Sequence, residues 1–600
     1  MADSTTLNET SPFGDKNLTA CTTPIDVKVD GQIPEWVHGV LYRVGLGTFS
    51  VPKPDGSVFH FNHPFDGLAM LHRFEIHGGN NPRVTYTSRH TANGVKSRII
   101  RNDSTLVFFG PDPCKTIFGR IQSVYHQLLG LCRGELEQRM RMDPEGENIN
   151  VAIAPNFPLG EDLEKQWGVD AGMALVVKTD ANILQLVDHQ TLEPKKAFTY
   201  GTIDMEYSDR FAASHHQYDM KTGEWFNFIL ETFPKPTWRV FSYSTPSVPG
   251  ATKVKKFQPI TQNLSRPNGY FFSSRPLKSC YTHSFAITDN YVIIPNWSYY
   301  FSYYSLSILW YGNAYDSLYF DPNLPTLFHV LSRTTGLHVA TYESDSAFGF
   351  HTANAWDDNG TIWMDIATYP DGRVIDASFD FARMYNEKYV KPVSYRKIGR
   401  KASNTYVPVA ELRRYKLNDI PSTPSNIPRR AVYELLGLDI DLPHFDPRRH
   451  CKPYRYLYGT CRNQNESTHK NGHDVILSAV QKMDLGPPAT NFASTLEQVG
   501  SSCSIDKKQG SGPNTRRFDP PSASCSEPIF LPNPLGTEED DGVVLTMVNE
   551  IRNDDQEACI LVILDAKNMT EMARAEIGPW HAKTIHGSFV DQAGRGISVS

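Results

Sequence analysis

The chain has 600 residues and a formal net charge of -7. Its 59 lysines and arginines are not gathered in blocks, so a nucleic acid is not expected as a partner. Aromatic residues make up 12%, and the 41 glycines and 41 prolines recur between short aromatic and β-branched runs. Because many short strands joined by turns use residues in this way, the composition favours an all-β fold.

The N-terminal residues and the cysteines bear on where the protein resides. Residues 1–24 are polar and threonine-rich, show no secretory signal, and are expected to be a disordered tail. The nine cysteines are odd in number, scattered and free of a CxxC spacing, which indicates a reducing compartment. No run of about 18 apolar residues predicts a transmembrane helix. We therefore expect residues 25–600 to form a single domain of a cytoplasmic protein.

Residues 109–135 carry the clearest helical pattern. Apolar side chains recur there at spacings of three and four, which places them on one face of a helix. The face is formed by Ile117, Phe118, Ile121, Val124, Tyr125, Leu128 and Leu129. This face either packs on a protein core or lies in the outer layer of a membrane, with Lys115 and Arg120 at the headgroups.

Two later segments interrupt the pattern of strands and turns. Residues 297–330 concentrate tryptophan, tyrosine and leucine in one insertion, which is either core or the wall of a substrate path. Residues 499–526 are rich in serine, proline and glycine and are expected to form a mobile surface loop.

Four of the 20 histidines lie in or beside β-prone runs that are far apart in the sequence: His215, His283, His351 and His586. Because alternate side chains of a strand point to opposite faces, each strand can direct one histidine inward, and only one of His215 and its neighbour His216 can do so. Four neutral imidazoles suit iron, copper, zinc or nickel and leave an octahedral ion two open positions. Each histidine taken alone is better explained as a hydrogen-bonded core or surface residue.

The contexts of these four histidines resemble the iron-ligand motifs of the carotenoid cleavage oxygenase family. Further similarity lies in the block from Phe65 to His72, in 452–459, and in Glu-Pro-Ile-Phe from Glu527. The resemblance implies a seven-bladed β-propeller with a cap of helices and loops over its top face. It also implies one Fe(II) per chain, held by the four histidines, while His60, His63, Asp66 and His72 have structural roles.

In this family three glutamates accept hydrogen bonds from the iron-bound histidines, as is usual for metal-binding imidazoles. The resemblance assigns these roles to Glu527, Asp441 and Asp180. Each aspartate is one methylene shorter than glutamate, so either its backbone moves inward or a water bridges the gap. Thr179 matches the position where carotenoid-cleaving relatives have a threonine near an open iron site. Stilbenoid-cleaving relatives have a lysine there, which Lys178 would supply if the alignment moved by one residue.

The implied activity is that of a non-haem Fe(II) dioxygenase. It would use O2 as co-substrate to cleave a C=C bond of a carotenoid or apocarotenoid, giving two carbonyl products. The long insertions and the Thr-Asp-Ala-Asn block look most like fungal members that cleave torulene or β-carotene. The alternatives are cleavage of a stilbenoid, the non-oxidative retinyl ester isomerisation of one animal branch, and a non-catalytic, membrane-associated carotenoid-binding protein.

The resemblance also implies peripheral association with a membrane surface or a lipid droplet, where an apolar polyene substrate resides. A Pro-Asp-Pro-Cys-Lys segment around Cys114 is similar to the membrane patch of the animal retinoid isomerase. Cys114 is therefore a candidate lipidation site. The candidate membrane-binding side chains are Ile117, Phe118, Ile121 and Val124. Residues 297–330 are implied to wall the substrate tunnel near the membrane, and no protein partner is predicted.

Overall fold

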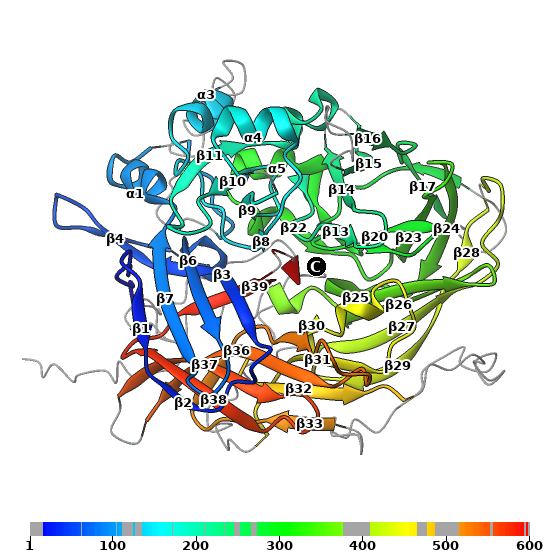
Figure 1. Ribbon diagram of the computed structural model, residues 1–600. Helices are drawn as coiled ribbons and strands as arrows, with labels where there is room; N and C mark the ends of the chain where they lie inside the picture. Colours follow the sequence, from blue (N-terminus) through cyan, green and yellow to red (C-terminus); the bar gives the residue numbers. More distant parts are fainter. Residues whose placement is uncertain are drawn as a thin grey trace, which may run out of the picture.

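The structure is a computed structural model that describes residues 16–61, 63–103, 105–110, 124–125, 135–170, 172–208, 211–232, 235–244, 253–265, 273–375, 409–425, 427–464, 477–486, 515–552, 556–592, 594 and 596–597. Within these ranges, seven sheets of four to six strands surround a common axis (Figure 1). The chain forms a seven-bladed β-propeller, which confirms the predicted all-β fold class.

The first four sheets are built mainly from strands in the N-terminal part of the chain. From one edge to the other, the first is β1 (Ile25–Val27), β7 (Arg83–His90), β6 (Leu68–His77), β3 (His38–Thr48), β39 (Lys583–Asp591) and β40 (Gly596–Ile597). The second is β11 (Pro194–Phe198), β10 (Leu184–Val187), β9 (Leu175–Lys178) and β8 (Ala152–Ala154). In the third, β12 (Phe211–Ala212) and β13 (Gln217–Asp219) both pair with β14 (Glu224–Glu231), followed by β15 (Thr237–Ser244) and β16 (Lys253–Lys256). The fourth is β19 (Ala286–Ile287), β20 (Tyr291–Asn296), β23 (Thr326–Ser332), β24 (His338–Ser344) and β28 (Arg429–Arg430).

The remaining three sheets complete the ring. The fifth is β25 (Phe348–Asp358), β26 (Thr361–Tyr369), β27 (Glu411–Leu417) and β29 (Val432–Leu438). The sixth is β30 (Asp441–His444), β31 (Tyr456–Cys461), β32 (Ala479–Asp484) and β33 (Thr515–Phe518). The seventh is β2 (Val29–Gly31), β38 (Glu571–Gly578), β37 (Glu557–Asp565) and β36 (Gly542–Ile551), with β34 (Ala523–Cys525) and β35 (Ile529–Pro532) both paired to β36. Three two-stranded sheets lie outside the blades: β4 (Ser50–Pro52) with β5 (Val58–His60), β17 (Gln262–Ser265) with β18 (Ser273–Pro276), and β21 (Tyr299–Phe301) with β22 (Leu318–Phe320).

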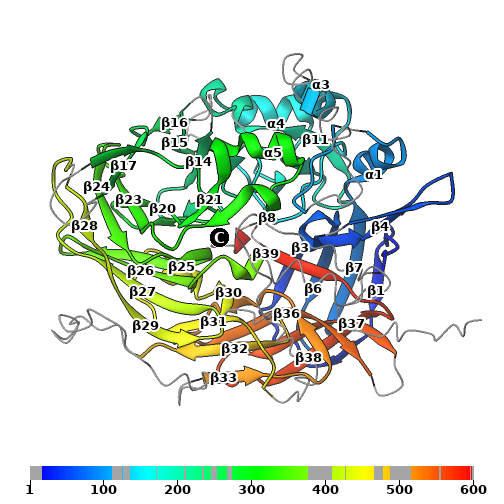
Figure 2. The same cartoon turned by 180° about the vertical axis from the view of Figure 1, so that it is seen from behind.

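The helices gather on one side of the propeller instead of being spread among the blades. Figure 1 and the reverse view in Figure 2 both show α1 (Asn93–Ile100), α3 (Glu135–Met142), α4 (Glu161–Trp167) and α5 (Leu306–Tyr311) together. Short 3-10 helices are η1 (Pro64–Asp66), η2 (Tyr200–Thr202), η3 (Met205–Tyr207), η5 (Ser302–Ser305), η6 (Tyr315–Ser317) and η8 (Pro447–Arg449). In the described ranges, no helix has the length and apolar character needed to cross a membrane.

Face-to-face packing of blades explains why the central strands are continuously apolar. In β37, Cys559, Leu561 and Ile563 join a core with residues of the first sheet, such as Leu41 and Phe74. The intervening residues of the same strand point the other way and join a second core with the sixth sheet; they are Ile560, Val562 and Leu564. Both faces are buried, so this strand lacks the alternation of polar and apolar residues that a half-exposed strand shows.

Strands from near the two ends of the described chain close the ring. In the first sheet, β3 pairs antiparallel with β39, and β6 lies on its other side. The short strand β2, just ahead of β3, instead pairs with β38 in the seventh sheet. Hydrogen bonds between distant parts of the chain therefore hold neighbouring blades together, and a ring closed in this way leaves only short edges.

Residues 16–24 are tied to the body, although they were predicted to belong to the tail. The Lys16 ammonium is 2.8 Å from Glu557, and the Asn17 side chain bonds to the backbone of Phe49 and Ser50. The Leu18 N–H donates to the Gly47 carbonyl. The folded body therefore begins before residue 25, while residues 1–15 lie outside the described ranges.

The predicted loop 499–526 is only partly a loop. Residues 499–514 lie outside the described residues, but Thr515–Phe518 forms β33 and Ala523–Cys525 forms β34, each paired in a blade. The overall composition of 499–526 does not predict these strands, because they use short runs without proline, and Pro520 and Pro521 lie between them.

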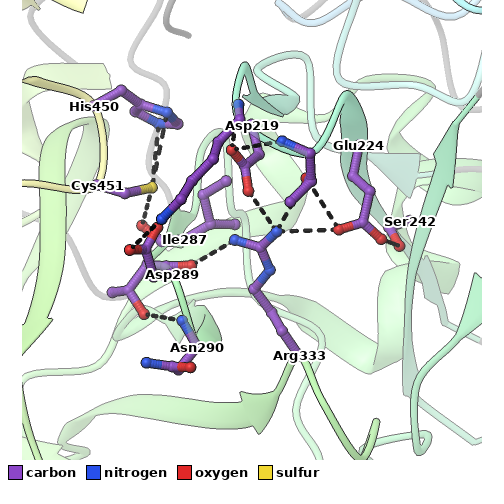
Figure 3. A network of polar contacts seen from close by, with 12 residues as sticks. Asp219, Glu224, Ser242, Ile287, Asp289, Asn290, Arg333, His450 and Cys451 are labelled. Atoms are coloured by element: carbon purple, nitrogen blue, oxygen red, sulfur yellow. Dashed lines mark hydrogen bonds and ion pairs between the residues drawn. The ribbon is translucent and has the colours of Figure 1, made fainter. Parts of the chain in front are cut away.

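A buried ionic network joins the third and fourth blades (Figure 3). The Arg333 guanidinium lies 2.6 Å from Asp219 and 3.0 Å from Glu224, and it also donates to the Thr288 carbonyl at 2.7 Å. The side chains of Arg333 and Asp219 are 8% and 6% exposed. By contrast, the nearby pair of Lys221 and Asp289 is largely exposed.

We predict that Arg333→Ala lowers the free energy of unfolding by about 3–5 kcal/mol, because it leaves a buried carboxylate without its cation. The matched change Lys221→Ala breaks the exposed pair and should cost less than about 1 kcal/mol. Urea unfolding followed by tryptophan fluorescence measures both. Equal losses in the two variants would contradict a role for Arg333 in joining the blades.

Candidate metal centre

The four predicted histidines meet at the axis because each lies at an irregularity of an inner strand. His215 lies in the gap between β12 and β13, and His283 lies just ahead of β19. His351 and His586 lie at bulges, where two residues of β25 or β39 face one residue of the neighbouring strand. Bulges re-aim side chains out of the regular ladder. The strand ends and bulges therefore turn one imidazole from each of four blades toward a common point.

The histidines are buried and close enough to share one ion. One nitrogen from each lies within 4.8 Å of the others, and the Nε2 atoms of His215 and His283 are 3.0 Å apart. No more than 9% of any of the four residues is exposed. His351 Nε2 is buried without a hydrogen-bond partner among the described residues. Since buried polar atoms are normally paired, this nitrogen fits a metal ligand.

Three of the four histidines are oriented by a carboxylate. The Nδ1–H of His351 donates to Asp441 at 2.7 Å, that of His283 to Asp180 at 2.9 Å, and that of His586 to Glu527 at 2.9 Å. A donating Nδ1–H leaves the lone pair on Nε2, which is the form that binds metal. The three predicted carboxylates therefore touch three of the predicted histidines directly.

The backbone moves inward at Asp441, so its shorter side chain needs no bridging water. Opposite Gly459, β30 has a bulge of two residues, Leu442 and Pro443. Leu442 has φ +49°, and its N–H donates to the Asp441 carboxylate at 2.8 Å. A Cβ atom at Gly459 would lie 2.8 Å from the Asp441 carbonyl oxygen, so only glycine permits this approach.

The charges around the axis favour a divalent cation. Burial alone would raise the pKa of Asp441, but the adjacent His351 and its hydrogen bond bring that pKa below the usual value. Against the effect of burial, His283 likewise brings the pKa of Asp180 below its usual value. Again against the effect of burial, His586 and Arg43 together bring the pKa of Glu527 below its usual value. Burial lowers the pKa of Arg43 to about 10, so it stays charged at neutral pH.

Burial also lowers the pKa values of His215 and His586. It lowers the pKa of His215 well below its usual value, and the neighbouring histidines add to the effect. The three carboxylates carry two more negative charges than the Arg43 guanidinium balances in this low-dielectric site. Because buried charge is costly unless it is paired, the donor set and its charge fit an ion such as Fe(II).

Aromatic side chains continue from the histidines toward the 105–110 segment. The centroid of the Phe350 ring lies 5.5 Å from that of His283 and 6.5 Å from that of Phe65. The ring centroids of Phe65 and Phe109 are 5.0 Å apart. A narrow gap also borders the site, lined by His215, Ser284, His351, Thr352, Leu442, Pro443 and Glu527.

The predicted structural residues of the Phe-Asp-Gly block have identifiable partners. The Asp66 carboxylate accepts from the N–H groups of Phe109 and Gly110 at 2.6 and 2.8 Å. His63 Nδ1 accepts from the Phe65 N–H, and His72 bonds to the Tyr86 hydroxyl. This part of the block therefore fixes the aromatic segment and supplies no ligand to the histidine cluster.

Three residues that the sequence analysis weighed do not join the histidine cluster: Lys178, Thr179 and His216. The Lys178 amine is buried and contacts His216 Nδ1, and the His216 ring stacks on Trp225 with centroids 4.2 Å apart. Thr179 is half-buried, and its hydroxyl makes no hydrogen bond to another described residue. Its catalytic role stays a prediction.

The predicted membrane residues Cys114, Ile117, Phe118 and Ile121 lie outside the described residues, and Val124 is half-buried. The residues that sequence reasoning missed are Arg43, Tyr281, Phe350 and Tyr369, which line or support the site. Arg43 had a signal, because a charged residue inside an apolar strand is rarely buried without a purpose.

Comparisons with known proteins agree with this geometry. A family model described as Retinal pigment epithelial membrane protein (RPE65) matches residues 14–591. A carotenoid dioxygenase of Neurospora crassa is 28% identical, covering 96% of this chain and 90% of its own length. A torulene dioxygenase of Gibberella fujikuroi is 28% identical over 94% of this chain and 90% of its own. A β,β-carotene 15,15'-dioxygenase of Mus musculus is 25% identical, covering 95% of this chain and 90% of its own length.

Solved structures share the fold. Cobalt-substituted Synechocystis apocarotenoid oxygenase (ACO) has a TM-score of 0.62 at 20% identity, covering 95% of this chain and 96% of that chain. A chimera of ACO and RPE65 has a TM-score of 0.63 at 20% identity, with coverages of 97% and 99%.

We predict that His215→Ala abolishes stoichiometric Fe(II) binding, because it removes a ligand at the centre of the cluster. His216→Gln, one residue away, keeps an acceptor for Lys178 and should retain the metal. Elemental analysis after anaerobic Fe(II) loading measures both, and circular dichroism checks that both fold. Metal loss of the same size in His216→Gln would contradict the assignment of His215.

Proposed function

Because the chain belongs to the family described as Retinal pigment epithelial membrane protein (RPE65), we propose that it is a non-haem Fe(II) dioxygenase that cleaves a C=C bond of a carotenoid or apocarotenoid. The reaction uses both atoms of O2 and gives two carbonyl products. The observation that carries the proposal is the cluster of four buried histidines within 4.8 Å, three of them oriented by carboxylates.

In the proposed reaction, His215, His283, His351 and His586 hold one Fe(II), which supplies the binding and redox chemistry of O2 when bound. The carboxylates of Asp180, Asp441 and Glu527 keep the Nδ1 protons of three histidines in place. They also compensate the charge of the ion. The protein's own contribution is therefore orientation and charge balance, and no side chain needs to act as an acid or base.

The surroundings of the cluster support an apolar polyene as substrate. Phe350 packs against the rings of His283 and His351, and Phe65 and Phe109 extend the aromatic surface away from the site. A conjugated chain packs well on such rings and needs no polar partner. Which C=C bond is cleaved depends on how far the chain advances along this surface. Torulene and β-carotene are the proposed substrates, because the curated relatives include enzymes named for them.

Cleavage of a stilbenoid is less well supported. A lysine that orients a phenol must present its amine to the substrate beside the metal. The Lys178 amine instead contacts His216, which faces Trp225. Thr179, with its hydroxyl not bonded within the described chain, is the residue proposed to lie near the open side of the iron.

Association with a membrane surface or lipid droplet is proposed from an exposed apolar patch. We define this patch as Tyr303, Leu306 and Trp310 of η5 and α5, which are 79%, 45% and 47% exposed. The Ala314 N–H donates to the Phe108 carbonyl and that of Tyr315 to the Phe109 carbonyl, so the segment that leads into the predicted interfacial helix lies beside α5 and η6. Aromatic side chains at such a patch suit a lipid interface, and Cys114 would add a lipid anchor.

The test of the activity is product analysis of Fe(II)-loaded protein under 18O2. Torulene, β-carotene, an apocarotenal and a hydroxystilbene are offered separately, and products are identified by chromatography and mass spectrometry. We expect aldehydes from a polyene that carry the label and reveal the cleaved bond. Cleavage of the stilbene alone would contradict the assignment of Thr179. Absence of product from iron-replete protein would contradict a dioxygenase and favour an isomerase or a binding protein.

For membrane association, we predict that the double change Leu306→Asp and Trp310→Asp shifts the protein from the liposome pellet to the supernatant. Two charges in the patch oppose its insertion into the headgroup region. Leu535→Asp is the matched control, because Leu535 is 91% exposed outside the patch. Unchanged pelleting of the double variant would contradict the proposed surface.

A further inference from the structure

Two of the carboxylates that orient histidines are also bound by a buried tyrosine. The Tyr281 hydroxyl donates to Asp180 Oδ2 at 2.7 Å, and the Tyr369 hydroxyl donates to Asp441 Oδ2 at 2.5 Å. The other oxygen of each aspartate accepts from its histidine at 2.9 and 2.7 Å. A chain of the form histidine, aspartate, tyrosine therefore occurs twice around the axis.

The third carboxylate is held in another way. Glu527 Oε1 accepts from His586, and its Oε2 accepts from the backbone N–H of Gly587 at 2.9 Å. The Arg43 guanidinium lies 4.0 Å from Oε2 and also donates to the Glu527 carbonyl. The tyrosines thus occur at the two positions where the chain has the shorter acid, while the longer acid has a cation beside it.

Packing fixes the direction of both tyrosine rings. Tyr281 stacks on Phe348 at 5.9 Å, and Tyr369 lies opposite Phe348 in the register of β25 and β26. Phe350 contacts both tyrosine rings at 6.3 Å. Tyr369 is 1% exposed and Tyr281 is 6% exposed. Their hydroxyls therefore meet the aspartates in a preset geometry, without loss of side-chain freedom when the metal binds.

We propose that Tyr281 and Tyr369 are positioning residues of the metal centre, each holding a short aspartate in the orientation that aligns its histidine. The inference rests on the proposed metal site.

The terminal torsion of an aspartate is soft. At Asp441, the bonds from His351 and from the Leu442 N–H both end on Oδ1, so they leave Oδ2 to be fixed. At Asp180, His283 Nδ1 lies 2.9 and 3.0 Å from the two oxygens and does not select one of them. The short, charge-assisted bond from the phenol supplies the second fixed point.

The exposure of the two aspartates indicates which tyrosine matters more for metal binding. The Asp441 side chain is 8% exposed, whereas that of Asp180 is 23% exposed. Water can replace a lost hydroxyl at Asp180 more readily than at Asp441. Tyr369 is therefore the more important of the two for holding the metal.

The test measures Co(II) binding to the apoprotein under anaerobic conditions, by competition with a chelator, together with the visible absorption of bound Co(II). We expect Tyr369→Phe to raise the Kd for Co(II) by about tenfold, which is the low end of the loss of affinity that follows when a hydrogen-bond partner near a metal ligand is removed. Tyr281→Phe should have a smaller effect, about threefold. The Co(II) absorption bands should shift in both variants, because a histidine has turned.

Tyr454→Phe is the matched control. The Tyr454 hydroxyl donates to Asp365 at 2.8 Å, its ring is 1% exposed, and Asp365 is paired with Arg414 and touches none of the four histidines. This change removes the same kind of bond elsewhere. It should lower the melting temperature of the apoprotein and leave the Kd for Co(II) and the absorption bands unchanged.

A double-mutant cycle separates positioning from packing. If Tyr369 acts through Asp441, then Tyr369→Phe should change the Kd less than about twofold when Asp441→Asn is already present. A full tenfold effect in that background, or unchanged Co(II) binding in Tyr369→Phe alone, would overturn the inference. Wild-type protein that binds no Co(II) would overturn the metal site of the proposed function and this inference with it, whereas unaffected variants of a metal-binding wild type overturn only the inference.

Discussion

Three ionised carboxylates face the axis of the propeller, and one buried guanidinium, Arg43, compensates only part of their charge. Charges of like sign in a low-dielectric interior repel strongly unless a cation lies between or beside them. The histidines offer four nitrogens at the centre. The inner strands of the seven blades therefore share one electrostatic requirement, which a divalent ion at the histidines satisfies. The carboxylates lie behind the imidazoles, so they can balance the ion without occupying its coordination positions.

The sequence predicts much of this arrangement because the histidines lie in distinctive local contexts. The pleat of a strand also separates His215 from His216 without any structure, since only one of two neighbours can face the axis. The composition predicts the all-β fold, and the family resemblance supplies the number of blades. The predicted loop and tail were less accurate, since β33 and β34 owe their pairing to neighbouring strands and not to their own composition.

What the sequence could not predict depends on pairing between distant residues. Tyr369 meets Asp441 because the register of β25 and β26 places its ring beside Phe348, and nothing near either residue records that register. The inward shift at Asp441 requires a leucine with positive φ and a glycine on the next strand. Leucine is not a residue that predicts such a conformation. Tyr281 was also missed, although it lies two residues before His283, a spacing that places both side chains on one side of an extended chain.

The pairing of β3 with β39 also sets the order of events during synthesis. Three of the clustered histidines, His215, His283 and His351, emerge from the ribosome well before His586, which lies on the strand that closes the ring. At about 5–20 residues per second, the nascent chain spends tens of seconds without its fourth ligand. During that interval the long-range closure has not formed, and a metal ion would find an incomplete and solvent-open set of imidazoles. Ring closure and completion of the histidine cluster are thus one event, so a partly synthesised chain cannot present all four imidazoles to one metal ion.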